Sequence, residues 1–187
     1  MLNDTHARCV SSSSAVNFNY AYNNANQRVS VTNGGGTYWV YQYDVLGQVT
    51  GAAKNWPGGG LVAGQQFGYN FDSIGNRQTA AFGGDQNGAN FTSASYGANL
   101  LNQYTNRTVP GVVDLMGSVN SNAAVTLNGQ TPYISGSYYR LKLAVDNTGG
   151  AIYPSITNQA VLGTNTVTIT GNTYLPQTPR AGVGSHY

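Results

Sequence analysis

The sequence predicts an all-β protein, in which a sheet of tandem antiparallel hairpins is followed by a small β-sandwich-like region. The composition is the first reason, because only 7% of residues are charged and none is Glu, whereas Gly, Asn, Thr, Ser and Tyr are abundant. Asn and Gly favour turns, and Tyr and Thr favour strands. An aromatic turn motif that recurs in the first half and short alternating segments in the second half are the other two reasons.

The recurring motif occurs four times, in residues 18–27, 39–48, 67–76 and 94–103. Its pattern is aromatic, any residue, Tyr, any residue, aromatic, then Asp or Asn, two variable residues, and Gly or Asn. In the fourth copy Ala98 stands where the others have the second aromatic residue. Aromatic residues at alternate positions put three rings on one face of a strand. Each copy therefore predicts a hairpin with an aromatic face.

The end of each motif predicts a tight turn. Asp or Asn starts the turn because its short side chain accepts hydrogen bonds from backbone N–H groups further on. Gly or Asn three residues later tolerates the positive φ that turns the chain back. The expected turn residues are Asn23, Asn26, Asp44, Gly47, Asp72, Gly75, Asn99 and Asn102.

This pattern resembles the YD-repeat, or RHS-repeat, family, whose signature is Tyr-Asp, two variable residues, Gly, and then Arg, Asn or Gln. Residues 43–50 and 71–77 carry the best matches. The resemblance implies a β-sheet wound in a spiral, which forms a hollow shell in full-length bacterial and teneurin proteins. It also implies a secreted or cell-surface location, and many members carry a variable C-terminal toxin inside the shell. We expect this chain to be a truncated piece of such a protein.

The second half, from about Thr108, predicts a different unit. Residues 112–115, 124–127, 138–145 and 165–170 are expected to be strands, with turn residues between them. In the longest of these, Leu141 and Leu143 face one way, and Arg140 and Lys142 face the other. Short strands at this spacing favour a small β-sandwich. Residues 96–179 are also similar to an immunoglobulin-like insert that lies between YD-repeats in some bacterial members.

The expected organisation therefore has four parts. Residues 1–16 form a disordered N-terminal segment, 17–107 the YD-repeat hairpins, 108–179 the sandwich-like domain, and 180–187 a flexible tail. The N-terminus lacks the apolar segment of a signal peptide, and the sequence has no apolar run long enough to span a membrane. Because the basic residues are scattered and the formal net charge is +2, we expect no nucleic-acid partner.

Residues with catalytic or metal-binding potential are few, and we expect no enzyme activity, metal or cofactor. His6 and His186 lie in opposite tails, and Cys9 is the single cysteine. The carboxylates of Asp44 and Asp72 are accounted for by turns, so they do not form a glycosidase pair. Residues 85–90 are only faintly similar to a calcium loop, because they lack its bidentate Glu, and we expect a plain loop. The glycine runs 34–36 and 58–60 lack the Lys of a phosphate loop and connect hairpins.

The aromatic residues of the second and third motifs carry the remaining functional potential. They could stack on sugars or peptides, or simply pack between hairpins. These residues are Trp39, Tyr41, Tyr43, Phe67, Tyr69 and Phe71. Three functions stay open: a non-catalytic structural scaffold, which we favour; an adhesive or carbohydrate-binding module; and an extracellular subunit that self-assembles through open sheet edges. Expected partners are the remainder of a larger YD-repeat protein or copies of this chain.

Overall fold

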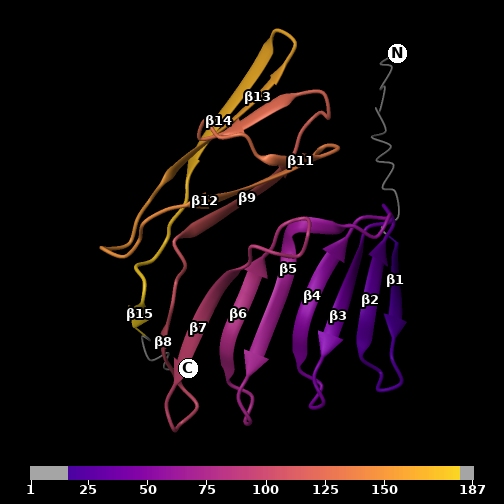
Figure 1. Cartoon of the computed structure of the whole chain (residues 1–187), viewed down its shortest axis with the longest axis vertical. Coiled ribbons are helices and arrows are strands. Elements are labelled where there is room, and N and C mark those ends of the chain that lie inside the picture. Colours follow the sequence, from indigo (N-terminus) through magenta and orange to yellow (C-terminus); the bar gives the residue numbers. More distant parts are fainter. Residues whose placement is uncertain (1–16, 182–187) are drawn as a thin grey trace, which may run out of the picture.

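The computed structural model describes residues 17–181, and all regular secondary structure within that range is β-strand (Figure 1). Strands that follow one another in sequence pair antiparallel to form the main sheet, in the order β1 to β8, and β15 is added beside β8. Their bounds are β1 Phe18–Tyr22, β2 Arg28–Asn33, β3 Tyr38–Tyr43, β4 Val49–Asn55, β5 Leu61–Phe71, β6 Arg77–Gly83, β7 Thr92–Ala98, β8 Tyr104–Arg107 and β15 Arg180–Ala181. The predicted fold class, an all-β chain with tandem hairpins, is confirmed.

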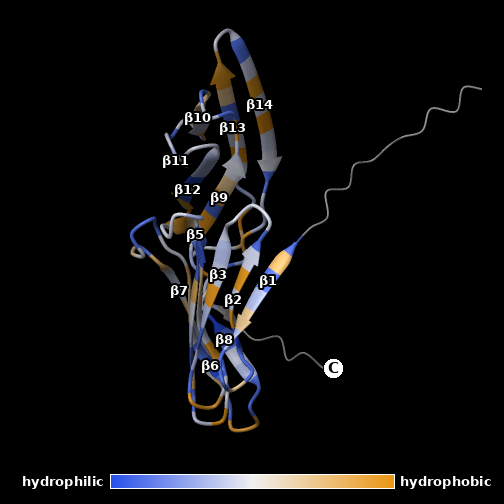
Figure 2. Cartoon of the chain, turned by 90° about the vertical axis from the view of Figure 1, so that its right-hand side faces the viewer, coloured by the Kyte–Doolittle hydropathy of each residue, from blue (hydrophilic) through white to orange (hydrophobic). Residues whose placement is uncertain are grey.

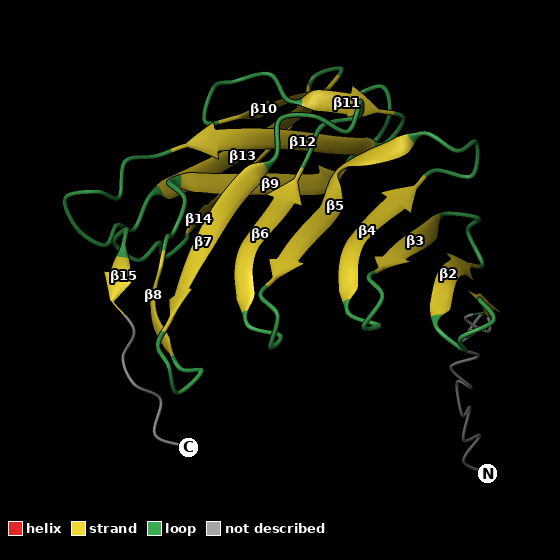
Figure 3. Ribbon diagram, turned by 60° about the horizontal axis from the view of Figure 1, so that its bottom comes forward, coloured by secondary structure: helices red, strands yellow, loops and turns green. Residues whose placement is uncertain are grey.

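The main sheet is a single curved layer. Seen from the side in Figure 2 it is thin, and Figure 3 shows its strands following one another along a bend. Strand alternation therefore gives this sheet two faces. One face carries Trp39, Tyr41, Phe67 and Tyr69, and the other includes small residues, such as Gly51 opposite Gly68. The buried apolar residues of this sheet are few and small, namely Val62, Ala63, Ala80 and Ala94.

The second region consists of two three-stranded sheets, in the orders β10-β13-β14 and β11-β12-β9. The bounds are β9 Val112–Ser118, β10 Ala124–Leu127, β11 Tyr133–Ser135, β12 Tyr138–Ala144, β13 Ser155–Leu162 and β14 Asn165–Asn172. Val125, Leu127, Leu143 and Ile156 are buried and form its apolar core. The four predicted strands are present, but β11 and β13 were not predicted. The sequence of β13 contains Asn158 and Gln159, which read as loop residues.

The chain leaves the main sheet after β8 and returns to it at β15. Arg180 pairs with Arg107 and Ala181 pairs with Asn106, so β15 is the antiparallel neighbour of β8. The expectation of a flexible tail from residue 180 is therefore wrong for residues 180 and 181, because the open edge of β8 offers backbone groups that they pair with. Residues 182–187 and the expected disordered segment 1–16 lie outside the described residues. The region between β8 and β15 is an insertion in the sheet.

Across residues 17–181 there is no helix with the length and apolar character to cross a membrane.

Candidate functional site: the turns and aromatic face of the sheet

The four motif turns share one hydrogen-bonding pattern. In each turn, Oδ1 of the first residue accepts hydrogen bonds from the backbone N–H groups two and four residues further along the chain. Asp44 Oδ1 accepts from Leu46 N and Gln48 N at 2.9 Å each, and Asp72 Oδ1 accepts from Ile74 N and Asn76 N. Asn23 and Asn99 make the same pair of contacts. The Asp or Asn of the motif thus satisfies donors that the turn would leave unpaired.

The fourth residue of each turn has the positive φ that the sequence predicts. It is 81° at Gly47, 92° at Gly75, 61° at Asn26 and 60° at Asn102. Only Gly, and less readily Asn, adopts this conformation without strain. A pair of backbone hydrogen bonds closes each loop, such as Asp44 N to Gln48 O at 3.0 Å and Gly47 N to Asp44 O at 3.1 Å.

The same loop also connects the hairpins at the opposite end of the sheet. The pair of backbone hydrogen bonds recurs in the loops that begin at Asn33, Trp56 and Asp85, and a glycine three residues later has positive φ in each. The plain loop expected at residues 85–90 is thus a further copy of the turn, in which Asp85 Oδ1 accepts from Asn87 N and Ala89 N. These backbone hydrogen bonds and the amide of Asn90 lower the pKa of Asp85. All seven connections between β1 and β8 therefore have one geometry.

The aromatic face is half-buried, and its rings contact each other rather than lying free. Trp39 stacks on Phe67 with ring centroids 5.9 Å apart. Tyr41, Tyr43, Tyr69 and Phe71 are also half-buried. The β-bulge near the third aromatic position lies on the partner strand, because Gln42 pairs with Gly51 and Tyr43 with Val49, which leaves Thr50 of β4 as the extra residue. The alternation along β3 is unbroken, so its three rings stay on one face as expected.

On this face arginines contact tyrosine rings within a hairpin, and tyrosine hydroxyls connect neighbouring hairpins. The guanidinium of Arg28 lies 4.5 Å from the ring centroid of Tyr20, and that of Arg77 lies 4.8 Å from the centroid of Tyr69. The hydroxyl of Tyr43 donates to the carbonyl of Arg28 at 2.7 Å, and the hydroxyl of Tyr104 accepts from Arg77 N at 2.8 Å. Ring faces and hydroxyls are therefore engaged within the sheet.

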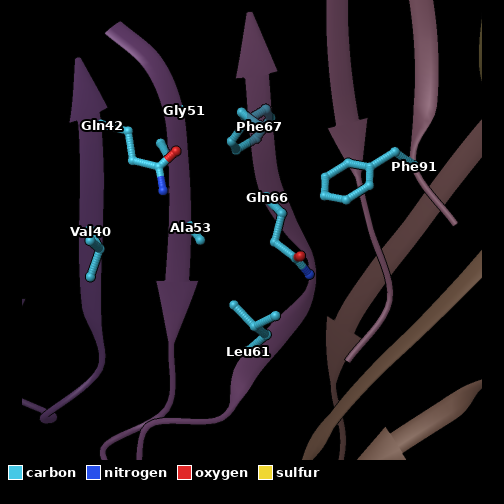
Figure 4. Close-up of a pocket in the computed structure, with 9 residues that line it drawn as sticks. Val40, Gln42, Gly51, Ala53, Leu61, Gln66, Phe67 and Phe91 are labelled. Carbon is cyan, nitrogen blue, oxygen red and sulfur yellow. The ribbon is translucent and has the colours of Figure 1, made fainter. Parts of the chain in front are cut away.

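The opposite face has a hollow of about 270 Å³ (Figure 4). Its floor includes Gly51 and Ala53, and Gln42, Leu61 and Phe91 stand around it. The other lining residues are Val40, Ala52, Gln66 and Phe67. The buried Gln66 uses its amide nitrogen to donate to the carbonyl of Asp85 at 2.7 Å. The lining has no ionisable side chain and no nucleophile, so this hollow offers shape and apolar surface rather than reactive groups.

Comparison with known families supports the reading of the turns. Residues 20–59 match the family model described as RHS Repeat. This segment is therefore similar to RHS repeats. The matched segment contains the first two motif turns and the Trp39 strand between them. A search of curated proteins finds no match.

Seven solved chains match this protein. One is a chain of the structure described as "Crystal Structure of TcdB2-TccC3-TEV", with 14% sequence identity and a TM-score of 0.44. The match covers 82% of the present chain and 7% of that solved chain. The present chain thus corresponds to a small part of the length of the solved protein.

The tips of the motif turns carry exposed apolar side chains. Val45 is 101% exposed and Leu100 102% exposed, and Leu46, Ile74 and Leu101 are also exposed. These residues occupy the two variable positions of the turn, at the ends of successive hairpins that Figure 2 shows along one end of the sheet. The turns at the other end hold Gly34 and Gly35, Pro57 and Gly58, and Gln86 and Asn87 in the same positions, so they carry no large aliphatic side chain. Sequence reasoning missed this asymmetry, although the variable positions could have revealed it.

A buried ion pair within the inserted region packs against the main sheet. Arg140 is 6% exposed and binds Asp114 through two hydrogen bonds, Nε to Oδ1 at 2.7 Å and Nη2 to Oδ2 at 2.8 Å. The pair lies beside Gly64 and Gly83, where a Cβ atom would approach Met116 Sδ or Asp114 Oδ2 at 2.6 or 2.9 Å. The sequence analysis placed Arg140 on the face away from the apolar core, and that face packs on the sheet.

Three further contacts, made by Tyr138 and Lys142, join the inserted region to the main sheet. The hydroxyl of Tyr138 donates to the carbonyl of Ala63, and its ring packs edge-on against Trp56 with centroids 5.5 Å apart. Burial raises the pKa of Tyr138 to about 12. Lys142 Nζ donates to the carbonyl of Asn90 at 3.0 Å.

The remaining candidate catalytic and metal-binding residues do not form a site in the described part of the chain. His6, Cys9 and His186 lie outside the described residues. Within the range 17–181 no three His, Cys, Asp or Glu side chains form a group that could hold a metal ion. Asp44 and Asp72 serve separate turns.

Proposed function

We propose that this chain is a non-catalytic scaffold segment of a larger RHS-repeat protein that is secreted or displayed on the cell surface. The repeated loop is the observation that carries the proposal. Because all seven connections between β1 and β8 share one geometry, each hairpin places the next at the same angle, which builds an extended curved wall. Such a wall is a structural element.

The surfaces of the sheet support the same proposal. It is a single layer, and its terminal strand β1 is exposed along its length, with Tyr20 48% and Tyr22 55% exposed. Apolar turn tips such as Leu100 add further uncovered surface. Open strand edges and apolar patches of this kind mark sites of protein contact. The expected contacts are further repeats of the same protein.

The engaged aromatic rings favour a scaffold over a carbohydrate-binding module. A sugar-binding platform needs free ring faces, whereas Trp39 and Phe67 cover each other, and Tyr20 and Tyr69 lie under arginines. These rings fix the spacing between hairpins.

Photo-crosslinking in the producing cells tests the proposal. A benzophenone amino acid at Asn19 reports on the β1 edge, and the same amino acid at Gly149, in an exposed loop of the insertion, is the matched control. We expect Asn19 to crosslink to a polypeptide segment with further Tyr-Asp turns, identified by mass spectrometry, and Gly149 not to do so. Absence of a crosslink at Asn19, or a crosslink to a segment without such turns, would contradict the scaffold role.

A further inference from the structure

Strand β14 is the most exposed strand of the inserted region. All eight of its residues, Asn165–Asn172, are exposed. It pairs with β13 on one side, and its other side pairs with no strand in the described part of the chain. Figure 2 shows β14 at the margin of the molecule, with alternating hydropathy along its length. Its outer backbone groups are therefore free to pair with another strand.

One side of β14 is apolar and uncovered. Val167 lies in register with Ala160 and Val125, and Ile169 with Asn158 and Leu127, so both belong to the face that forms the sandwich core. Val125 and Leu127 are 5% and 0% exposed, whereas Val167 and Ile169 are 59% and 64% exposed. The opposing sheet thus covers β10 and leaves the same face of β14 exposed.

The other edge strands of the inserted region have protection that β14 lacks. Strands β10 and β11 are short, with four and three residues. Strand β9 directs Asp114 and Met116 against the main sheet. Short length and inward charges are the usual means of blocking edge-to-edge pairing. Strand β14 has eight residues, no charge, no proline and no bulge.

We propose that β14 pairs antiparallel with β14 of a second copy of this chain, about a two-fold axis at Thr168. This register is self-complementary. It places Val167 of each copy opposite Ile169 of the other, and Thr166 opposite Thr170. The apolar pairs shield each other on the core face, and threonine pairs form on the outer face, as Thr157 and Thr170 already do between β13 and β14 at 3.1 Å.

The charge distribution favours a second copy as the occupant. The whole hairpin from Ser155 to Asn172 contains no charged residue, and the chain has a formal net charge of only +2. Two copies therefore meet without like-charge repulsion, and a charged partner strand would gain no ion pair here. The product is a continuous six-stranded sheet with β14 strands at its centre.

Sedimentation of the full chain over micromolar concentrations tests the inference. We expect a monomer–dimer equilibrium that changes little with salt. Val167→Lys brings two ammonium groups close to the pairing axis and should weaken the dimer at least about tenfold. Because Val167 is exposed, this variant should keep the wild-type circular dichroism spectrum. Two matched controls are Thr126→Lys on the opposite edge of the same sheet and Asn19→Lys on β1, and both should leave the dimer intact.

Disulfide trapping tests the register. In a Cys9→Ser background, Thr168→Cys places a cysteine directly opposite its own copy, where antiparallel Cα atoms lie roughly 4.5–5.5 Å apart. Val167→Cys meets its copy only across a diagonal and should trap far less. We expect Thr168→Cys to form a covalent dimer under mild oxidation.

The inference would be overturned by a monomer at every concentration, by a dimer that Val167→Lys leaves unchanged, or by equal trapping by the two cysteine variants. Loss of the dimer in Asn19→Lys alone would also overturn it, while leaving the proposed function standing, because association would then run through the repeat sheet.

Discussion

Removal of the Asp114 carboxylate is expected to cost more stability than any other single acidic truncation in residues 17–181. Asp114→Ala leaves the guanidinium of Arg140, which is 6% exposed, without its two hydrogen bonds of 2.7 and 2.8 Å. Breaking one side of a buried ion pair costs about 3–5 kcal/mol. For a chain of this size that lowers the melting temperature by roughly 6–20 °C.

A double-variant cycle separates the ion pair from simple loss of packing. Arg140→Met together with Asp114→Ala removes both charges, so the double variant should be at least about 1 kcal/mol more stable than Asp114→Ala alone. Asp146→Ala is the matched control, because Asp146 is exposed and its carboxylate bonds only to Thr148. The assay is urea unfolding followed by circular dichroism. The reasoning would be refuted if Asp114→Ala lowered the free energy of unfolding by less than about 1 kcal/mol, or if the double variant were no more stable than Asp114→Ala.

Three further predictions concern the turns and the junction. Gly75→Val should destabilise the fold by about 1–3 kcal/mol in urea unfolding, because its φ of 92° strains a β-branched residue, and an unchanged midpoint would count against the turn argument. The amide of Asn76 lowers the pKa of Asp72, so its stabilisation is present above the ordinary value of 3.8 and is lost as the pH falls through the lower folded pKa. Asp72→Asn should keep the turn and remove this acid dependence, which acid titration of unfolding measures. Burial raises the pKa of Tyr138 from 10.0 to about 12, so stability should fall as the pH rises through that interval, and Tyr138→Phe should flatten the decline.

The turn residues could be predicted from sequence because their roles are local. Asp44 and Gly47 lie within one loop, and both the side-chain cap and the positive φ follow from residue type and spacing. The loop at Trp56 has the same backbone hydrogen bonds without an Asp or Asn, so the motif could not reveal it. There the glycines alone permit the geometry, with Gly59 at a φ of 92°.

The contacts that place the inserted region could not be predicted, because they join residues far apart in sequence. Alternation placed Arg140 on the polar side of its strand, which is ordinarily the solvent side. Its burial depends on Gly64 and Gly83, more than fifty residues earlier, which leave room for the guanidinium and for Asp114. Strand β13 could not be predicted for a similar reason. The sequence around Asn158 is polar, and this segment forms a strand because it pairs with β10 and β14.

The way in which the chain enters and leaves the inserted region makes that region exchangeable. The buried amide of Asn147 donates to the carbonyls of Val109 and Pro176 at 3.0 and 2.7 Å, and Thr178 Oγ1 accepts from Val109 N at 3.0 Å. The segments by which the chain leaves the main sheet and returns to it are thus hydrogen-bonded to each other, next to the Arg107–Arg180 pair. A gene could gain, lose or replace the intervening module while both flanking strands keep their register. The same position, between β8 and β15, is suited to the insertion of a foreign domain by protein engineering.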